Sequence, residues 1–520
     1  MQFTAKDIIT SAPRRFRKEK ANGINTIFHF ELSGEENLLY TFKISDNQCE
    51  LNEGLIGQPK CVIKTNQKTY EELETGKANP QMALMLGKIK VSNLAEMMSF
   101  TKLFRKFDPS YLSPQSSTST VEYINRPNLT GPLEGITVVD FSRLLPGPLA
   151  SMFMADMGAN VLKIEDPDNP DYVRDFEPKL GDNSAFYYAL NRSKKSIAIN
   201  FLDKDGYCSI IEIIKRADVI IEQYRPGVMS KFKLDYNTIQ TINPKIIYLS
   251  ITGYGQNSTL AQAAGHDLNY IATAGLLSTI GQNENNITIP GVQIADIAGG
   301  SYMALNAVLA ALFQRERTGK GQYIDLSMTD AVLPLIALPF AEAQVKNQQV
   351  ARGEFQLAGG LANYNVYRCA DDRFLALGSL EPKFWNVVCE KLGHIEWQNE
   401  ILGGIDKNQS IKKELEGIFI QKSSADWISF FEQDDVCICV VNNLLDLVND
   451  KHIIERNLLS SQTIGNIEFK TIKMPVLLSG MENNENWLAP RLGEDTATVL
   501  SEYGVSIERI NKLKDSKIIK

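Results

Sequence analysis

A Ser-, Thr- and Pro-rich stretch at residues 108–130 (DPSYLSPQSSTSTVEYINRPNLT) constrains this sequence more than any other feature. It shows neither the 3.6-residue spacing of an amphipathic helix nor the alternation of a strand, so it is typical of a flexible linker. The 520 residues also exceed what one hydrophobic core usually accommodates. We therefore expect a first domain over residues 1–107 and a larger, separately folded remainder.

Charge divides the chain at the same place. Residues 1–107 carry 16 Lys and Arg against 12 Asp and Glu, a net charge of +4, whereas the remainder carries −12. An acidic body argues against nucleic acid as a partner, because phosphate neutralisation dominates that affinity. The basic cluster Arg14, Arg15, Arg17, Lys18 and Lys20 is consistent either with attraction to acidic headgroups or CoA phosphates, or with the solvated face of a first helix.

Composition predicts a soluble, intracellular protein. Hydrophobic residues make up 43% and charged residues 22% of the chain. The longest run without charged or strongly polar residues, 331–341, contains two prolines and is too short to span a bilayer, so we expect no transmembrane segment. Seven scattered cysteines form no CxxC pair, and we expect reduced thiols and no metal site. No signal peptide is recognised and the last residues, KIIK, are not an SKL-type signal, so we expect a cytoplasmic protein and leave peroxisome and mitochondrion open.

Residues 1–107 are predicted to form a small α/β domain. Residues 26–32 (TIFHFEL) and 39–44 (LYTFKI) alternate apolar and polar positions as strands do, and residues 61–64 (CVIK) form another short strand. A helix begins near Tyr70. The segment 81–86 (QMALML) is apolar nearly all round, which predicts that it fills a core or lines an apolar cavity.

The run ETGKANPQMALMLGKIKV within residues 52–100 resembles the sterol carrier protein type 2 domain. That resemblance implies a small α/β layer with a hydrophobic tunnel, and a lipid or acyl chain as its partner. Met82, Leu84, Met85, Leu86 and Met98 are then candidates to line the tunnel, because Met adapts to permissive apolar surfaces. For each residue taken singly, plain core is the alternative that its apolar character favours.

From Gly131 onward, strands and helices alternate. Residues 136–140, 161–165, 219–222 and 245–251 are buried strands, and a helix over 147–157 follows the first of them. This order predicts a parallel, doubly wound sheet. The first turn, residues 143–148 (RLLPGP), is not a GxGxxG phosphate cradle, so we expect no nicotinamide and no other cofactor.

Two side chains stand out as acid or base candidates. His266, one of four histidines, lies in AGHDLNY, where a neighbouring glycine suggests close backbone packing beside a ligand; a helix cap or core hydrogen bond is the alternative. Asp296 stands in ADIAGG, where an apolar strand is expected to give way to a long helix over 301–315; there the alternative is a simple cap.

Read in order, several motifs resemble the alpha-methylacyl-CoA racemases of the family III CoA-transferase superfamily: PLEGITVVDFSRLLPGPLASMFMADMGANVLKIE, EQYRPGVMSKFKL, ITGYGQ, AGHDLNY, ADIAGG, RTGKGQYIDLSMTDA and NYNVYRCADDRFLALGSLEPKFW. The resemblance implies an α/β fold with a Rossmann-like large CoA-binding domain (131–345) and a small domain (346–455). A C-terminal segment (456–520) returns to the large domain. It also implies an interlocked homodimer with the active site between large and small domains.

Racemases and transferases of this superfamily differ at the site. Transferases resemble the chain at Asp267, which in them carries acyl and CoA groups covalently, whereas racemases have the equivalents of His266, Asp296 and Glu381. The resemblance therefore implies proton removal alpha to a CoA thioester, with His266 on one face, oriented by Glu381, and Asp296 on the other. N–H groups at the start of the 296–300 helix are hypothetical donors to the enolate.

The expected substrate is a branched-chain fatty acyl-CoA or a sterol side-chain CoA, in which CoA is part of the substrate. A transferase that uses Asp267, and a lipid carrier with an inactive catalytic domain, remain alternatives. The resemblance implies the following CoA-binding residues, of which the charged ones are also consistent with solvated surface: Arg192, Lys194, Lys195, Ile199, Tyr224, Arg225, Lys231, Gly265, Asn269 and Tyr270. One position departs from the pattern, since Asp166 stands where the family has a phosphate-binding arginine, and Lys163 or Lys194 is expected to compensate.

Overall fold

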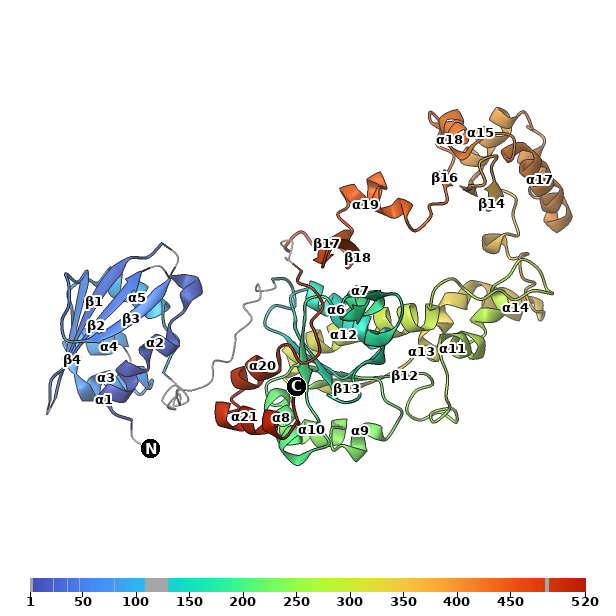
Figure 1. Ribbon diagram of the computed structural model, residues 1–520. Helices are drawn as coiled ribbons and strands as arrows, with labels where there is room; N and C mark the ends of the chain where they lie inside the picture. The colour runs from blue at the N-terminus through green and yellow to red at the C-terminus, as the bar shows by residue number, and fades with distance from the viewer. Residues whose placement is uncertain are drawn as a thin grey trace. The chain divides into compact units, whose positions relative to one another are not determined.

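The computed structural model describes residues 3–21, 23–34, 36–45, 47–78, 80–107, 130–481 and 486–520. The predicted linker at 108–130 lies, apart from its last residue, outside the described residues. The chain separates into two compact units, Met1–Thr120 and Val121–Lys520. Figure 1 shows the elements of each unit, and each is described by itself below.

Unit 1 is a five-stranded sheet covered by helices, with strand order β3-β2-β1-β4-β5. Only β1 and β4 pair in parallel; the other neighbours are antiparallel. Its elements are α1 (Ala5–Thr10), α2 (Ala12–Arg15), η1 (Lys18–Lys20), β1 (Thr26–Ser33), β2 (Leu38–Ser45), β3 (Gln48–Glu53), β4 (Cys61–Asn66), α3 (Gln67–Glu74), α4 (Pro80–Met85), β5 (Ile89–Val91) and α5 (Leu94–Lys102).

Aromatic rings fill the interior of unit 1. The ring of Phe100 on α5 lies 4.6 Å from Phe28, 5.2 Å from Phe42 and 4.5 Å from Phe104, measured between centroids. Such ring pairs contribute beyond the apolar area that they bury. They hold α5 against one face of the sheet.

The expectation that the methionines around α4 line a tunnel needs correction. Met82, Met85, Leu86 and Met98 are 59–88% exposed, and only Leu84 of the five candidates is half-buried. The core of unit 1 is instead built by β1, β2 and β4 together with the buried faces of α1 and α5.

Unit 2 contains a six-stranded, fully parallel sheet with strand order β10-β7-β6-β11-β12-β13. Its elements through the sheet are β6 (Thr137–Asp140), α6 (Pro146–Asp156), β7 (Asn160–Glu165), η3 (Tyr172–Asp175), β8 (Lys179–Leu180), β9 (Asn183–Ser184), α7 (Ala185–Asn191), β10 (Lys194–Ala198), α8 (Lys204–Ile214), β11 (Val219–Glu222), α9 (Val228–Lys231), α10 (Tyr236–Ile242), β12 (Ile247–Thr252), α11 (Asp267–Thr273), η4 (Leu276–Thr279), the π-helix η5 (Ala295–Tyr302), α12 (Met303–Thr318) and β13 (Gln322–Ser327).

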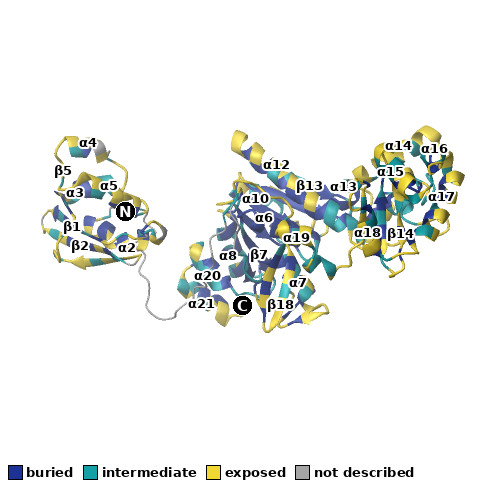
Figure 2. Cartoon of the chain, turned by 90° about the horizontal axis from the view of Figure 1, so that it is seen from above, coloured by how far each residue is buried: buried dark blue, intermediate teal, exposed yellow. Residues whose placement is uncertain are grey.

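The strand order reverses between β6 and β11. From β6 the chain proceeds outward to β7 and β10, and from β11 it proceeds the other way to β12 and β13. Helices therefore cover both faces of the sheet, whose strands are buried throughout most of their length (Figure 2). In such sheets the loops beyond the carboxyl ends of the two central strands separate and leave a crevice for a ligand.

The C-terminal segment packs back onto strand β10. The Asp495 carboxylate accepts the Ser196 N–H at 2.9 Å, and the Lys520 N–H donates to the Ala198 carbonyl at 3.1 Å. Helices α20 (Thr496–Glu502) and α21 (Ile507–Asp515) contribute Val499, Leu500, Ile510 and Leu513 to the core on that face of the sheet.

A second, smaller core in unit 2 gathers residues 362–436, including Trp385, Trp397 and Trp427. The remaining elements of unit 2 are α13 (Met328–Ala331), η6 (Leu333–Ile336), α14 (Ala337–Lys346), η7 (Gln356–Ala358), β14 (Tyr364–Arg368), β15 (Phe374–Gly378), α15 (Pro382–Leu392), α16 (Trp397–Glu400), α17 (Gly404–Phe419), α18 (Ser424–Phe431), β16 (Ile438–Val440), η8 (Asp446–Val448), α19 (Lys451–Glu455), β17 (Leu459–Ile464) and β18 (Ile467–Ile472).

Two helical stretches have the length and composition of a membrane span, Ala295–Thr318 and Met328–Lys346. The first joins η5 to α12, is 44% buried and packs one side into the core of the sheet, and core helices of soluble proteins pass the same test. The second is only 17% buried, so it presents an apolar surface. Two such helices are weak evidence for a membrane protein.

Candidate active site

A cavity of about 360 Å³ lies at the carboxyl ends of the central strands, where the strand order reverses. Loops that follow β6, β11 and β12 form its wall, and both His266 and Asp296 line it. The two acid or base candidates, which are 30 positions apart in the sequence, therefore face one space. The cavity also takes in Tyr224, Arg225, Gly265 and Tyr270, four of the residues predicted to bind CoA.

His266 occupies the N-cap position of α11, and its side chain is exposed. Its backbone N–H donates to the Asn269 Oδ1 at 3.1 Å, so the Asn269 side chain caps the start of α11. The preceding residue must be glycine, because a Cβ on Gly265 would lie 2.7 Å from the Tyr270 ring. The Tyr270 hydroxyl in turn donates to the Gly265 carbonyl at 2.5 Å, so ring and backbone fix the approach to His266.

Asp296 lies in the first turn of the π-helix η5, which continues directly into α12. No strand precedes it within the described residues 286–294, contrary to expectation. Its backbone N–H donates to the Asp267 Oδ1 at 3.0 Å, so the carboxylate of Asp267 caps η5. Burial and, secondly, the negative charge of Asp267 raise the pKa of Asp296 to about 7.

The predicted enolate donors at the start of this helix are already engaged. The Asp296 N–H bonds to Asp267, and the Ile297 N–H donates to the Gln293 carbonyl at 3.0 Å. A backbone N–H with a partner of its own cannot serve a developing oxyanion without losing that partner. This part of the sequence-based expectation is therefore wrong for those two groups.

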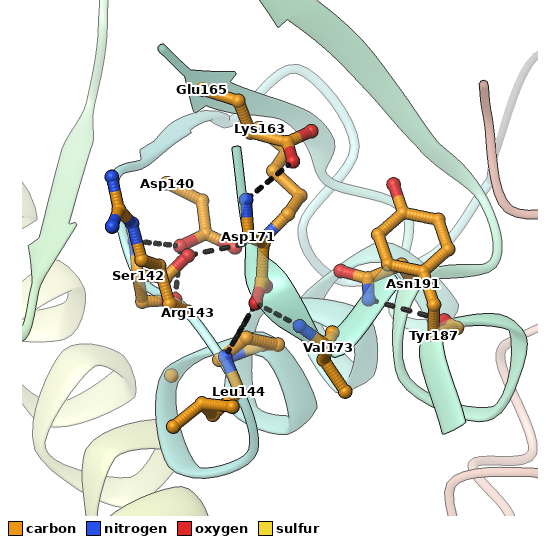
Figure 3. A network of polar contacts seen from close by, with 12 residues as sticks. Asp140, Ser142, Arg143, Leu144, Lys163, Glu165, Asp171, Val173, Tyr187 and Asn191 are labelled. Carbon is orange, nitrogen blue, oxygen red and sulfur yellow. Dashed lines mark hydrogen bonds and ion pairs between the residues drawn. The ribbon is translucent and has the colours of Figure 1, made fainter. Parts of the chain in front are cut away.

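A buried charge network shapes the loop between β6 and α6, one wall of the cavity (Figure 3). The Asp171 carboxylate accepts the Leu144 N–H at 3.1 Å, and Asp140 accepts the Ser142 N–H at 2.8 Å. Leu144 has φ +60°, an unusual conformation for a non-glycine residue. Two fixed carboxylates thus hold a strained backbone in the cavity wall, as is common at functional sites.

Lys163 and Lys194 balance those two carboxylates. The Lys163 Nζ lies 2.9 Å from Asp171 Oδ2, and the Lys194 Nζ lies 3.3 Å from Asp140 Oδ2, with all four side chains fully buried. Burial lowers the pKa of Lys194 to about 7, against the opposing effect of Asp140. For Lys163 the nearby carboxylates outweigh burial and raise its pKa.

These pairings correct several predicted CoA contacts. Arg192 and Lys194 are 0% exposed, and Arg192 is paired with Asp156, so neither has donors free for a phosphate. Ile199 is a core residue. Lys195, which pairs with Glu502 at 3.6 Å, and Lys231, which is exposed on α9, are not among the described residues that line the cavity, and their contacts with CoA stay predictions. Lys163 cannot replace the family's arginine for the same reason as Lys194.

Arg143 is the cavity residue that the sequence reasoning missed. It lines the wall together with Arg225, and its guanidinium lies 5.8 Å from the centroid of the Tyr224 ring. Its Nη2 donates to the Asn169 carbonyl at 3.1 Å. Asp166 builds that acceptor loop, since its Oδ1 accepts the N–H groups of Asp168 and Asn169. The sequence carries a signal for it, because Arg143 begins the first turn of the sheet, residues 143–148, where a phosphate-binding loop would lie.

Glu381 is not among the described residues that line the cavity. It is the N-cap residue of α15, where its backbone carbonyl accepts the Phe384 and Trp385 N–H groups. Its carboxylate acts electrostatically on Cys437, an exposed residue just before β16. The predicted contact that orients His266 is therefore not made by Glu381 of the same chain.

Comparison with protein families assigns both units. Residues 133–496 match the model of CoA-transferase family III, and residues 8–105 match the SCP-2 sterol transfer family. The chain belongs to CoA-transferase family III. It is an enzyme of that family with an SCP-2 domain at its N-terminus, as the motifs predicted.

Individual relatives include both activities of the family. The chain is 33% identical to the human alpha-methylacyl-CoA racemase, over 74% of this chain and 97% of the racemase. It is 31% identical to the mouse succinyl-CoA:glutarate CoA-transferase, over 71% and 86%. A crystal structure of a CAIB/BAIF family protein from Brucella suis, 26% identical, superposes with a TM-score of 0.64 over 72% of this chain and 100% of that one. These identities define the family, and both racemases and transferases lie within it.

Proposed function

We propose that this enzyme is a 2-methylacyl-CoA racemase that acts on branched-chain fatty acyl-CoA or sterol side-chain CoA. The observation that carries the proposal is the shared cavity of His266 and Asp296. Inversion at the alpha carbon needs an acid or base on each face, since a single base returns the proton to its original side. A pKa of about 7 suits Asp296 to give and to take a proton near neutral pH.

Asp267 is better suited to support Asp296 than to carry an acyl group. Its Oδ1 already accepts the Asp296 N–H at the start of η5. A covalent intermediate on Asp267 would remove the negative charge that holds this turn. The alternative function, a CoA transferase that uses Asp267 as nucleophile, keeps its support from the 31% identical transferases.

Arg143 and Arg225 are the basic residues that we assign to the CoA phosphates, because both line the cavity. Guanidinium groups bind phosphate in a bidentate manner, and Arg143 is held by the Asn169 carbonyl in a loop that Asp166 shapes. In this proposal Asp166 does not bind phosphate in place of the family's arginine. It shapes the loop whose Asn169 carbonyl holds Arg143, and Arg143 binds the phosphate.

We also propose a homodimer in which Glu381 of the partner subunit reaches His266. Exposed apolar side chains on η6 and α14 support it: Leu335, Leu338, Phe340 and Val345 are 53–88% exposed. An apolar helical stretch that is only 17% buried is typical of an interface.

Proton NMR of a purified 2-methylacyl-CoA in D₂O tests the proposal. Racemisation exchanges the alpha proton for deuterium and yields both epimers. A stable alpha proton, together with CoA transfer to an added carboxylic acid, would instead establish the transferase.

Asp296→Asn should separate binding from chemistry. The amide keeps the side-chain shape but cannot exchange a proton, so exchange is expected to fall about 10²- to 10⁴-fold while acyl-CoA affinity changes little. The paired control is Asp166→Ala, which removes the acceptor of the Asp168 and Asn169 N–H groups and should weaken affinity with a much smaller effect on turnover. Exchange at nearly the wild-type rate in Asp296→Asn would contradict its assigned role.

A further inference from the structure

A second cavity, of about 280 Å³, lies beside the active-site cavity at the carboxyl edge of the sheet. Glu222, the last residue of β11, and Ser250, its neighbour on β12, both line it. Of the residues described for the two cavities, only Arg225 and Pro226 line both. The other lining residues have no part in the function proposed above. Small-molecule pockets usually begin at about 300 Å³, so this space fits a small ligand.

Glu222 is a buried acid without a basic partner. It is 4% exposed, and no Lys, Arg or His of the described residues forms an ion pair with it. Burial raises the pKa of Glu222 to about 7, against its hydrogen bonds with Ser250 and with the Tyr224 N–H. A cation in the cavity would supply the missing counter-charge. Other buried carboxylates of the sheet and its loops each have a Lys or Arg partner: Asp140, Glu165 and Asp171.

Three tyrosine rings from three elements form part of the same lining. They are Tyr236 of α10, Tyr248 of β12 and Tyr323 of β13. Their centroids lie 5.4, 6.0 and 6.1 Å apart, and the Tyr248 hydroxyl donates to the Leu234 carbonyl at 2.7 Å. The faces of aromatic rings are electronegative and attract an ammonium group within about 6 Å. Rings and carboxylate therefore favour the same kind of ligand.

The charges of the lining are negative on balance. Glu222 and Asp235 are its carboxylates, and Arg225 is the one basic residue among the described residues that line it. Arg225 also lines the active-site cavity, where its charge opposes the burial that raises the pKa of Tyr270 to about 12. It is not among the groups that shift the pKa of Glu222. An anionic ligand would be repelled by two carboxylates, and a neutral one would leave Glu222 without a counter-charge.

We propose that this cavity binds a small alkylammonium ion. The ammonium group pairs with the Glu222 carboxylate and lies against the rings of Tyr236 and Tyr323. Binding requires no step of the reaction in the active-site cavity, so the proposal applies equally to a racemase and to a transferase. Because Glu222 Oε2 also accepts the Tyr224 N–H at 2.8 Å, the bound cation is linked to one wall of the active-site cavity.

Isothermal titration calorimetry of the full-length protein tests the proposal, with choline and ethanolamine as probes. A salt concentration of about 0.15 M screens non-specific attraction to exposed charges. At least one probe should bind saturably, and at least about tenfold more tightly than the neutral alcohol in which a tert-butyl group replaces the trimethylammonium group of choline. Tighter binding of ethanolamine would assign a primary ammonium to the site, and tighter binding of choline a quaternary one.

Two variants remove the two parts of the site separately. Glu222→Gln should weaken binding at least about tenfold, because the amide keeps an acceptor for the Tyr224 N–H but carries no charge. Tyr323→Leu replaces a ring that is 37% exposed and should weaken binding about fivefold.

The pH dependence identifies Glu222 as the partner of the cation. Binding to wild type should weaken from about pH 8 to about pH 6 as Glu222 takes up a proton, and Glu222→Gln should lose this dependence. Burial raises the pKa of Tyr224, Tyr248 and Tyr323 further from this range. The remaining titratable residues of the lining are Arg225, Asp235 and Tyr236.

The matched control is Glu212→Gln, the same substitution on α8, outside the cavity lining. It should bind like wild type, and thermal unfolding shows whether each variant is folded. Wild-type affinity in Glu222→Gln, equal affinity for the neutral alcohol, or no binding of either amine would overturn the proposal. So would a loss of binding in Asp296→Asn alone, which would place the ammonium group in the active-site cavity.

Discussion

Two neighbouring carboxylates, Asp267 and Asp296, set the pH range in which the site can move protons. Asp267 accepts the Asp296 N–H, and its charge is the second cause, after burial, of the raised pKa of Asp296. In the direction in which Asp296 is the base, the rate should rise with pH through about 7, because the carboxylate form is required. In the opposite direction Asp296 is the acid, and the rate should fall over the same range.

Asp267→Asn is expected to move the rising and the falling limb of the pH–rate profile to lower pH by up to about one unit. The amide oxygen still accepts the Asp296 N–H, but the charge that disfavoured a second carboxylate is gone. Rates of alpha-proton exchange measured across pH 5–9 would follow the shift. Asn269→Ala, which removes only a neutral cap from His266, should lower the rate without shifting the pH–rate profile. Complete loss of turnover in Asp267→Asn would point to the covalent role of a transferase instead.

At the scale of elements, close packing between α11 and the loop before it positions His266. A Cβ on Gly265 would meet the Tyr270 ring at 2.7 Å and the Tyr254 hydroxyl at 2.9 Å, and the two rings pack edge to face at 5.2 Å. Neither ring can withdraw without disturbing the other. Gly265→Ala should therefore displace His266 and lower the exchange rate at least about tenfold.

Gly291→Ala provides the comparison, because Gly291 precedes η5 and has no atom within 4 Å of its Cβ position. Its rate should equal that of wild type. The two alanine variants differ only in what the added methyl group touches. A similar rate in both would show that the packing around Gly265 does not govern His266.

The burial of individual elements explains which parts of the fold the sequence could predict. Runs of Val, Ile and Leu identify β6, β7, β11 and β12, because both faces of a parallel sheet are buried. The charged residues between them are ambiguous. Lys163, Arg192 and Lys194 resemble phosphate ligands in the sequence, but their partners Asp171, Asp156 and Asp140 lie 8, 36 and 54 positions away.

Site predictions differed in success for the same reason. His266 is the N-cap residue of α11, and Asp296 lies in the first turn of η5. Both helices begin at the carboxyl edge of the sheet, so the two side chains share a cavity. Their motifs are local, so the sequence reveals them. The pKa of Asp296 and the π-helical turn depend on a contact with Asp267 across 29 positions, which spacing does not encode.

At the scale of the whole molecule, the two units have separate cores and different surface chemistry. Unit 1 closes its own aromatic core, and unit 2 closes two larger cores around its parallel sheet. Neither unit needs the other to bury its strands. We therefore propose that the covalent connection serves a shared acyl substrate and not folding.

A chain of residues 130–520 alone tests that purpose. A tethered carrier raises the local concentration of its ligand to about the millimolar range, which matters most for substrates that are scarce in water. Truncation should thus lower kcat/KM about five- to tenfold for long methyl-branched acyl-CoA and leave short ones unchanged. Residues 1–120 added as a separate protein should restore the rate only near millimolar concentration. An equal loss for short and long chains would mean that unit 1 acts on the catalytic unit itself and not on the supply of substrate.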